Sequence, residues 1–384
     1  MKKGNLSFVL LFLSLSITTL AQIPNGYYDG TQNLTGFTLK TKLHTIIKDF
    51  DSQSYNSLKD LYAGTNAKNG FRDRYYEEDD TVLDIYSENP DGPDAYNYNP
   101  DDPMGSGANE GDAFNREHLI PQSYFDSNSP MRSDAFHVWP ADSKVNGWRD
   151  NYGFGTVSNA QNATPCNSGA TNLPCKSLNG TLKGKFTENS SITVVEPIDE
   201  FKGDIARVFL YFATCYENLM PGFYNSSNAA VKTMFDGSAN KVFSDDFLEV
   251  LIAWHLMDPP SQREKDLNDY IYYTFQENRN PYIDHPEFAS IIWGIGLNTD
   301  ELEYQTRKDV TVYTTSMKEV VIRLENPEKS IERVWIYDTN GNLIQTQENK
   351  SAQTELRLRL PQNGVYILKI EGKRLEFNTK VLIN

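Results

Sequence analysis

Apolar residues recur at helical spacing through the first three quarters of the chain. In residues 37–50, Leu39, Leu43 and Ile47 stand four positions apart, which places them on one face of a helix. Residues 204–219 are apolar on almost every side, a pattern typical of a helix buried in a core. Two further helices, rich in aromatic residues and separated by a Pro-Pro pair, are predicted at residues 245–257 and 267–276.

Runs with strand character are shorter in this part of the chain. They occur at residues 81–86 and around residues 118–120. Together with the four predicted helices, they indicate an α+β domain that contains more helix than sheet.

The hydrophobic pattern changes after about residue 298. From Thr311 onward apolar and polar residues alternate, which is typical of strands with one buried face. Asn-Gly pairs at residues 340–341 and 363–364 predict tight turns between strands. The four predicted strands are residues 320–324, 334–337, 356–360 and 365–370. We therefore expect a small all-β module at residues 306–384, with a boundary near residue 305.

The first 21 residues have the three parts of a signal peptide. Lys2 and Lys3 form a charged start, an apolar run covers residues 8–17, and small residues precede Gln22. The run is too short to cross a bilayer comfortably, and no other stretch approaches the roughly 20 apolar residues that a membrane helix needs. We expect an exported chain without a membrane span, secreted or at the cell surface, whose main domain covers residues 22–305.

The chain has three cysteines, Cys166, Cys175 and Cys215. An odd count allows at most one disulfide, and the short separation of the first two favours the Cys166–Cys175 pair. Cys215 stands in an apolar helical run and is expected to be buried.

The net charge is −16 at pH 7, which by itself argues against a polyanionic substrate. The acidic residues are unevenly distributed, because residues 72–112 hold many carboxylates and few cations, whereas residues 115–150 are close to balanced. A bound divalent cation would add positive charge locally. Residues 91–102 cluster oxygen ligands but lack the spacing of an EF-hand, which favours a solvated acidic loop over a calcium site.

Candidate residues for phosphodiester hydrolysis are Glu117 and His118, followed some thirty residues later by Asn146 and Arg149. The reaction needs a base that deprotonates water, a metal that neutralises charge, and often a cation near the product phosphate. His118 is the candidate base, and Glu117 with the amide oxygen of Asn146 suits a hard cation such as Mg²⁺. Because neighbours on a strand point to opposite faces, Glu117 and His118 share one site only if the strand bends or ends there. Pro121 is compatible with such an end.

Each of these residues also has a structural interpretation. His118 could be a hydrogen-bonded core histidine, and Glu117 a surface carboxylate or the partner of Arg116. Asn146 precedes a glycine and could mark only a turn or a helix end. Arg149 could pair with a carboxylate as readily as with a phosphate. The combination of the two segments favours catalysis for His118 and Glu117 and leaves the role of Arg149 open.

Three ordered blocks of the chain resemble the endonuclease I family of periplasmic and extracellular nonspecific nucleases. The blocks are residues 115–121 (NREHLIP), 136–151 (FHVWPADSKVNGWRDN) and 276–287 (QENRNPYIDHPE), and the resemblance covers roughly residues 25–295. It implies a ββα-metal (His-Me finger) core surrounded by helices, with the histidine on a strand and the asparagine on the following helix. The implied substrate is DNA, with RNA as a second candidate.

Carried over to this chain, the resemblance implies that Glu117 and Asn146 ligate Mg²⁺, with Mn²⁺ or Ca²⁺ as alternatives, and that His118 is the general base. Arg149 matches an arginine of the second block. The chain departs from the family where many members have consecutive histidines, because residues 136–137 read Phe-His. It also has no clear match for the family's phosphate-binding arginine, for which Arg132 is the nearest candidate. Structural roles are expected for His137 and His285.

The C-terminal module resembles the sorting domain of type IX secretion. The resemblance rests on residues 334–341 (VWIYDTNG) and 360–370 (LPQNGVYILKI). It implies that the module is recognised by the outer-membrane secretion machinery and takes no part in catalysis.

The first functional hypothesis is a secreted, divalent-metal-dependent nonspecific endonuclease, expected to be a monomer, that leaves a 5′-phosphate. A second is a secreted binding or adhesive protein on the same fold that has lost activity, against which the retained Glu117, His118 and Asn146 argue. A third is a metal-dependent hydrolase of other phosphodiesters, which only the choice of substrate distinguishes.

Overall fold

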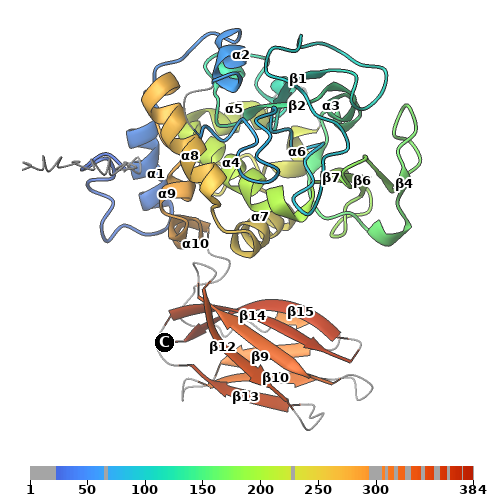
Figure 1. Ribbon diagram of the computed structural model, residues 1–384. Helices are drawn as coiled ribbons and strands as arrows, with labels where there is room; N and C mark the ends of the chain where they lie inside the picture. Colours follow the sequence, from blue (N-terminus) through green and yellow to red (C-terminus); the bar gives the residue numbers. More distant parts are fainter. Residues whose placement is uncertain are drawn as a thin grey trace, which may run out of the picture.

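The computed structural model of the protein describes residues 23–383 apart from short segments, and the predicted signal peptide lies outside these residues. The segments left out are residues 65–67, 226–229, 294–304, 308–309, 315–318, 325–329, 339–341, 350–354, 361–363 and 374. Two large apolar cores, which share no residue, lie in different parts of the chain: one extends from Tyr28 to Trp293 and the other from Val312 to Val381. A third, small cluster consists of Val82, Tyr98 and Phe114. The first part mixes helices with short strands, and the second consists of strands (Figure 1). The predicted α+β class with an all-β C-terminal module is confirmed.

Three of the four predicted helices lie where the hydrophobic pattern placed them. They are α1 (Gly36–Ile47), α4 (Lys202–Cys215) and α7 (Asp245–Met257). The fourth, α8 (Gln262–Ile271), begins five residues early because Ser261 and Glu264 form a capping box there. Its predicted C-terminal half is a π-helical turn. The remaining helices of this part, apart from α3 described below, are α2 (Ser57–Tyr62), α5 (Met220–Tyr224), α6 (Val231–Met234), α9 (Pro281–Asp284) and α10 (Glu287–Trp293).

Helix α4 lies at the centre of the first core, where α1, α7 and α9 contact it. Every residue of α4 after Lys202 is buried, in agreement with its all-round apolar sequence.

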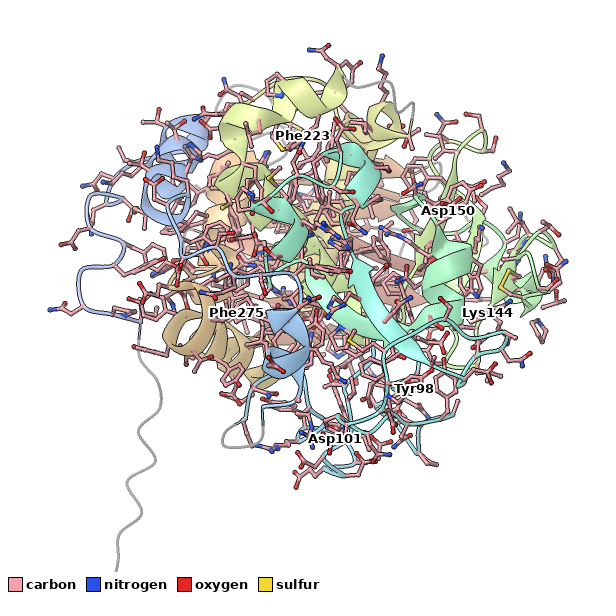
Figure 2. All side chains as sticks on the ribbon, turned by 90° about the horizontal axis from the view of Figure 1, so that it is seen from above. Tyr98, Asp101, Lys144, Asp150, Phe223 and Phe275 are labelled. Atoms are coloured by element: carbon pink, nitrogen blue, oxygen red, sulfur yellow. A yellow bond between two sulfur atoms is a disulfide. The ribbon has the colours of Figure 1, made fainter. Side chains whose placement is uncertain are left out.

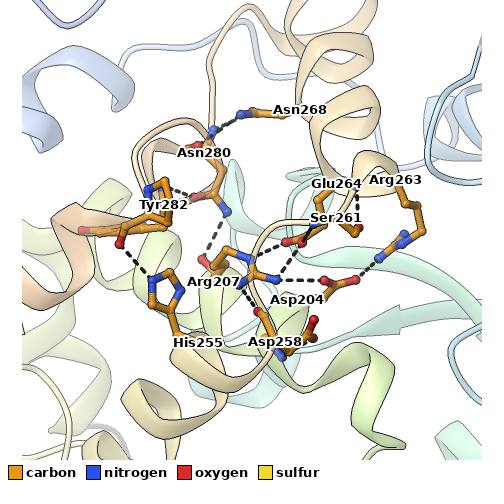
Figure 3. Close-up of polar contacts among 12 residues, drawn as sticks. Asp204, Arg207, His255, Asp258, Ser261, Arg263, Glu264, Asn268, Asn280 and Tyr282 are labelled. Atoms are coloured by element: carbon orange, nitrogen blue, oxygen red, sulfur yellow. Dashed lines mark hydrogen bonds and ion pairs between the residues drawn. The ribbon is translucent and has the colours of Figure 1, made fainter. Parts of the chain in front are cut away.

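A buried ionic network joins α4 to α8 (Figure 3). The Arg207 guanidinium donates to both oxygens of Glu264 at 2.5 and 2.6 Å, and Arg263 donates to Asp204 at 2.5 Å. Burial alone would raise the pKa of Asp204, but Arg263 and Arg207 hold it below its usual range. Asn280 extends the network by donating to the Arg207 carbonyl at 3.1 Å. The network therefore connects the third of the three sequence blocks, residues 276–287, to the core helices.

A five-stranded sheet with very short strands follows the site region and carries the disulfide. Its order is β3 (Gly153–Phe154), β7 (Thr193–Glu196), β6 (Leu182–Lys185), β5 (Cys175–Lys176) and β4 (Thr164–Pro165). Cys166, which follows β4, and Cys175, the first residue of β5, form the predicted disulfide, drawn as a yellow bond in Figure 2. Cys215 is free and buried, as expected.

The predicted strand at residues 81–86 is wrong. Within it only Val82 forms a bridge, with Arg72, and the chain then turns. The Asp84 carboxylate accepts from the backbone N–H of Tyr86 at 2.9 Å, and the Asp84 carbonyl accepts from Glu88 at 3.0 Å. An aspartate side chain that hydrogen-bonds to the backbone two residues on favours a turn over a strand. The apolar residues of this segment are buried, but in a loop.

The C-terminal module consists of two four-stranded antiparallel sheets (Figure 1). The first has the order β13 (Glu355–Arg359), β10 (Glu319–Leu324), β9 (Val310–Thr314) and β8 (Gln305–Arg307). The second has the order β12 (Leu343–Glu348), β11 (Arg333–Tyr337), β14 (Gly364–Gly372) and β15 (Leu375–Ile383).

The four predicted strands of the module correspond to β10, β11, β13 and β14. Strands β8, β9, β12 and β15 were not predicted separately; β12 reads LIQTQE, with too few apolar residues for a clear alternation. The predicted turn at residues 340–341 and Asn363 of the other Asn-Gly pair lie outside the described residues. Among the helices that the structure describes, none is long and apolar enough to cross a membrane.

Candidate active site

The two blocks 115–121 and 136–151 form a hairpin followed by a helix. Strand β1 (Phe114–His118) pairs antiparallel with β2 (Val138–Asp142), and α3 (Ser143–Arg149) follows β2 directly. The helix begins there because the Asp142 side chain accepts from the backbone N–H groups of Lys144 and Val145 at 2.8 and 2.7 Å. The ββα arrangement implied by the resemblance is therefore present, and Figure 2 labels Lys144 and Asp150 near the two ends of α3.

Strand β1 ends at His118, which is the condition stated above for Glu117 and His118 to share a site. Both side chains line one cavity of about 470 Å³, together with Asn146 and Arg149. The other lining residues are Tyr55, Met104, Gly105, Ser106, Asn115, Arg116, Pro121, Gln122, Asp150 and Asn151. All four predicted site residues are thus brought together, although they lie in two segments of the chain.

Glu117 is held by contacts to one of its two carboxylate oxygens. Its Oε1 accepts from the Tyr86 hydroxyl at 2.7 Å and lies 3.3 Å from Nη1 of Arg149. The side chain is 1% exposed, and this burial raises its pKa, while Arg149 and Tyr86 act in the opposite direction. Since Oε1 already has two partners, Oε2 is the oxygen left for a ligand in the cavity.

The two ring nitrogens of His118 have different surroundings. Nε2 lies 3.0 Å from the backbone carbonyl of Arg132. A carbonyl only accepts, so Nε2 carries the hydrogen and Nδ1 is the acceptor of a neutral ring. Burial, helped by His137 nearby, lowers the pKa of His118 to about 3, which keeps the imidazole neutral.

Asn146 lies one helical turn after the start of α3, and its amide is oriented by β1. Its Nδ2 donates to Oδ1 of Asn115 at 2.7 Å and to the Arg116 carbonyl at 3.4 Å. With the amino group directed to β1, the Oδ1 atom is the end of the amide available to a ligand. A carboxylate oxygen and an amide oxygen are donors that fit Mg²⁺, Mn²⁺ or Ca²⁺.

Arg149 lies behind the carboxylate, at the C-terminal end of α3. Its side chain is 2% exposed, and its guanidinium donates to the carbonyls of His118 at 2.8 Å and Leu119 at 2.6 Å. It also lies over the Phe154 ring at 4.8 Å. These contacts hold the end of β1 and the Glu117 carboxylate in place, and of the two roles that the sequence left open for Arg149 they are those of a residue paired with a carboxylate.

Tyr55 and Tyr86 were missed by the sequence interpretation. The Tyr55 ring stacks on the His118 ring, with centroids 5.8 Å apart and an interplanar angle of 21°. Arg116 and the exposed Arg132 lie over the same Tyr55 ring, at 4.4 and 4.8 Å. Tyr55 lies in a loop sixty residues before the start of block 115–121, so no periodicity or spacing connects it to the site.

The other residues named from the resemblance have structural contacts. His137 is buried and its Nε2 bonds to the Met131 carbonyl at 2.7 Å. His285 pairs with Glu287 at 3.1 Å, and neither residue lines the cavity. In the third block, Gln276 donates to the Asp134 carboxylate at 2.8 Å, which fixes the loop that leads into β2.

Comparison with known proteins places this geometry in a family. A family model described as endonuclease I matches residues 35–287, well over half of the chain. The chain belongs to the endonuclease I family. It is similar to the extracellular ribonuclease of Bacillus subtilis (strain 168), with 30% identity over 269 residues that cover 70% of this chain and 78% of the relative. The extracellular ribonuclease of Bacillus amyloliquefaciens is 29% identical over 282 residues, which cover 73% of this chain and 82% of that protein.

A second family model, described as a secretion system C-terminal sorting domain, matches residues 316–384. This match confirms that the all-β module resembles a type IX sorting domain. The endonuclease I protein is therefore an exported nuclease, secreted or at the cell surface, and its C-terminal module is a type IX sorting domain.

Proposed function

We propose that this endonuclease I protein is a divalent-metal-dependent endonuclease that hydrolyses phosphodiester bonds in DNA and in RNA with little regard to sequence. The observation that carries the proposal is the convergence of Glu117, His118 and Asn146 on one cavity at the end of β1. The ribonuclease names of both relatives support RNA as a substrate beside DNA.

His118 acts as the general base in this proposal. The bond from Nε2 to the Arg132 carbonyl directs the lone pair of Nδ1 away from that contact, and burial keeps the ring neutral. A neutral imidazole nitrogen can take a proton from water, while stacking against Tyr55 fixes the plane of the ring. The protonated ring then returns the proton to solvent or to the leaving oxygen.

Glu117 and Asn146 would hold the cation through Oε2 and Oδ1. When bound, a divalent cation neutralises charge on the scissile phosphate and on the leaving 3′-oxygen, which leaves a 5′-phosphate on the product. Tyr86 and Arg149 position the carboxylate through its other oxygen. A ligand that is held in this way needs little rearrangement to bind the cation.

Arg116 and Arg132 supply the positive charge for the substrate backbone. Both guanidinium groups lie over the Tyr55 ring, which lines the cavity together with Arg116. A net charge of −16 therefore does not exclude a polyanionic substrate, because phosphate contacts depend on the charge near the site.

The test is a cleavage assay on the mature protein with supercoiled plasmid and with a structureless RNA. We expect nicking of the plasmid and degradation of the RNA in Mg²⁺ or Mn²⁺, loss of both in EDTA, and recovery when the metal is added back. Binding of nucleic acid without cleavage in every metal would instead support the inactive binding protein. Cleavage of small phosphodiesters alone would support the third hypothesis.

A further inference from the structure

Three carboxylates converge in the acidic loop region that precedes β1. One ligand oxygen from each of Asp73, Glu77 and Glu88 lies within 4.8 Å of the other two. Asp73 and Glu88 are 1% and 0% exposed, whereas Glu77 is exposed. None of the three lines the cavity at the end of β1, so they form a separate cluster.

Glu88 provides a second and independent observation. Both of its carboxylate oxygens are buried, and neither has a hydrogen-bond partner within the described part of the chain. Asp73 differs, because it accepts from the backbone N–H groups of Tyr75, Tyr76 and Glu77 at 3.0 to 3.1 Å. A buried carboxylate without a partner is costly. Burial, together with nearby Asp94 and Asp73, raises the pKa of Glu88 to about 9, as expected for a buried carboxyl close to other carboxylates.

We propose that Asp73, Glu77 and Glu88 form a second cation site, which binds Ca²⁺ and stabilises the loop behind the active site. Two oxygens that bind the same Ca²⁺ at about 2.4 Å can be at most about 4.8 Å apart, which agrees with the cluster. Three carboxylates in irregular backbone are also typical of Ca²⁺, whereas Mg²⁺ usually takes one or two.

The position of Glu88 connects this cluster to the catalytic carboxylate. Asp84 and Tyr86 lie in the same turn, and the Asp84 carboxylate accepts from the backbone N–H of Asp142 at 2.9 Å. Tyr86 donates to Glu117. A cation bound by Glu88 would therefore stabilise the turn that holds both the start of α3 and the Glu117 side chain. Its role is structural, and it does not depend on the proposed nuclease mechanism.

The test measures Ca²⁺ binding by calorimetry and thermal unfolding on the full mature chain, with Asn146→Ala introduced to weaken the cavity site. We expect one Ca²⁺ to remain bound and to raise the unfolding temperature by roughly 5 °C at saturation. Glu77→Gln removes one charged ligand and should weaken this binding at least about tenfold. Glu78→Gln is the matched control, since Glu78 is exposed, adjacent and outside the cluster.

The Glu88→Gln variant tests whether Glu88 is a cation ligand or only a buried carboxyl. Without Ca²⁺ this variant should be as stable as the parent or more so, because a neutral amide replaces a buried carboxyl that has no hydrogen-bond partner, but the stabilisation by Ca²⁺ should disappear. The proposal is overturned if Ca²⁺ leaves the unfolding of the parent unchanged. It is also overturned if the Ca²⁺ response survives in Glu77→Gln and Glu88→Gln, or is lost equally in Glu78→Gln.

Discussion

His118 and Glu117 are adjacent in the sequence but have different proposed roles, as a general base and as a metal ligand. Substitution of each should therefore cause a different kinetic defect. His118→Ala removes the proton acceptor and leaves both oxygen ligands in place. We expect turnover to fall by roughly 10² to 10⁴ while substrate binding and the Mg²⁺ dependence survive. Cleavage rate measured against Mg²⁺ concentration tests this, with the exposed Glu78→Ala as a control. Rescue of His118→Ala by excess metal would contradict the assignment of a base.

Glu117→Ala removes a metal ligand, and its defect should therefore depend on the metal. We expect the Mg²⁺ concentration for half-maximal rate to rise and the maximal rate to fall, because the remaining amide oxygen of Asn146 binds a cation weakly. The same titration measures both quantities. A lower maximal rate with an unchanged metal requirement would show that Glu117 is not a ligand.

Two arginines near the cavity should respond to substitution by lysine in different ways. Arg149→Lys keeps the charge, but its single ammonium nitrogen cannot occupy the positions of both Nη1 and Nη2, so we expect a loss of stability of about 3 kcal/mol and a lower kcat. Arg132 is exposed, and Arg132→Lys should leave the unfolding temperature unchanged. Denaturant unfolding and steady-state kinetics on both variants test the difference. Equal stability of the two would contradict a buried positioning role for Arg149.

At the scale of elements, the sequence predicted the helices whose buried residues recur at regular spacing. Helices α1, α4 and α7 were predictable because their apolar residues repeat at helical spacing and meet one core. The segment 81–86 has an equally apolar composition, but a single aspartate side chain, Asp84, hydrogen-bonds to its backbone and forms a turn. The hydrophobic pattern does not show when a side chain will hydrogen-bond to the backbone in place of a neighbouring strand.

The motif residues of the candidate site could be predicted from the sequence, but the residues that hold their side chains in place could not. Glu117, His118 and Asn146 were found from residue types and order, and the resemblance implied the ββα arrangement that places them together. Tyr86 and Tyr55 contact the motif from loops far away in the sequence. Neither contact can be predicted from the spacing of residues along the chain, because both contacts form only when the loops pack against β1.

The turn that carries Tyr86 gives a prediction for the element as a whole. Tyr86→Phe retains the buried ring and removes the hydroxyl that donates to Glu117 at 2.7 Å. Loss of a partner that orients a metal ligand usually costs about 10- to 100-fold in metal affinity or activity. We expect a shift of that size in the Mg²⁺ titration with little change in unfolding temperature, and Tyr96→Phe in the same loop region is the control. An unaltered titration would mean that Arg149 alone positions Glu117.

At the scale of the whole molecule, catalysis and sorting are assigned to different parts of the chain. The candidate catalytic residues line a cavity in the part of the chain that holds the first apolar core, and the strands of the sorting domain enclose a second core that shares no residue with the first. Removal of residues 306–384 should therefore leave the cleavage rate of the secreted nuclease unchanged, because no candidate catalytic group is lost. The main thermal transition should also remain, since the first core is intact. Cleavage assays and calorimetry on the truncated and full chains measure both quantities, with His118→Ala in each as the inactive reference. A truncated protein that unfolds cooperatively but does not cut would refute the proposed boundary near residue 305 and would assign the C-terminal module a part in activity.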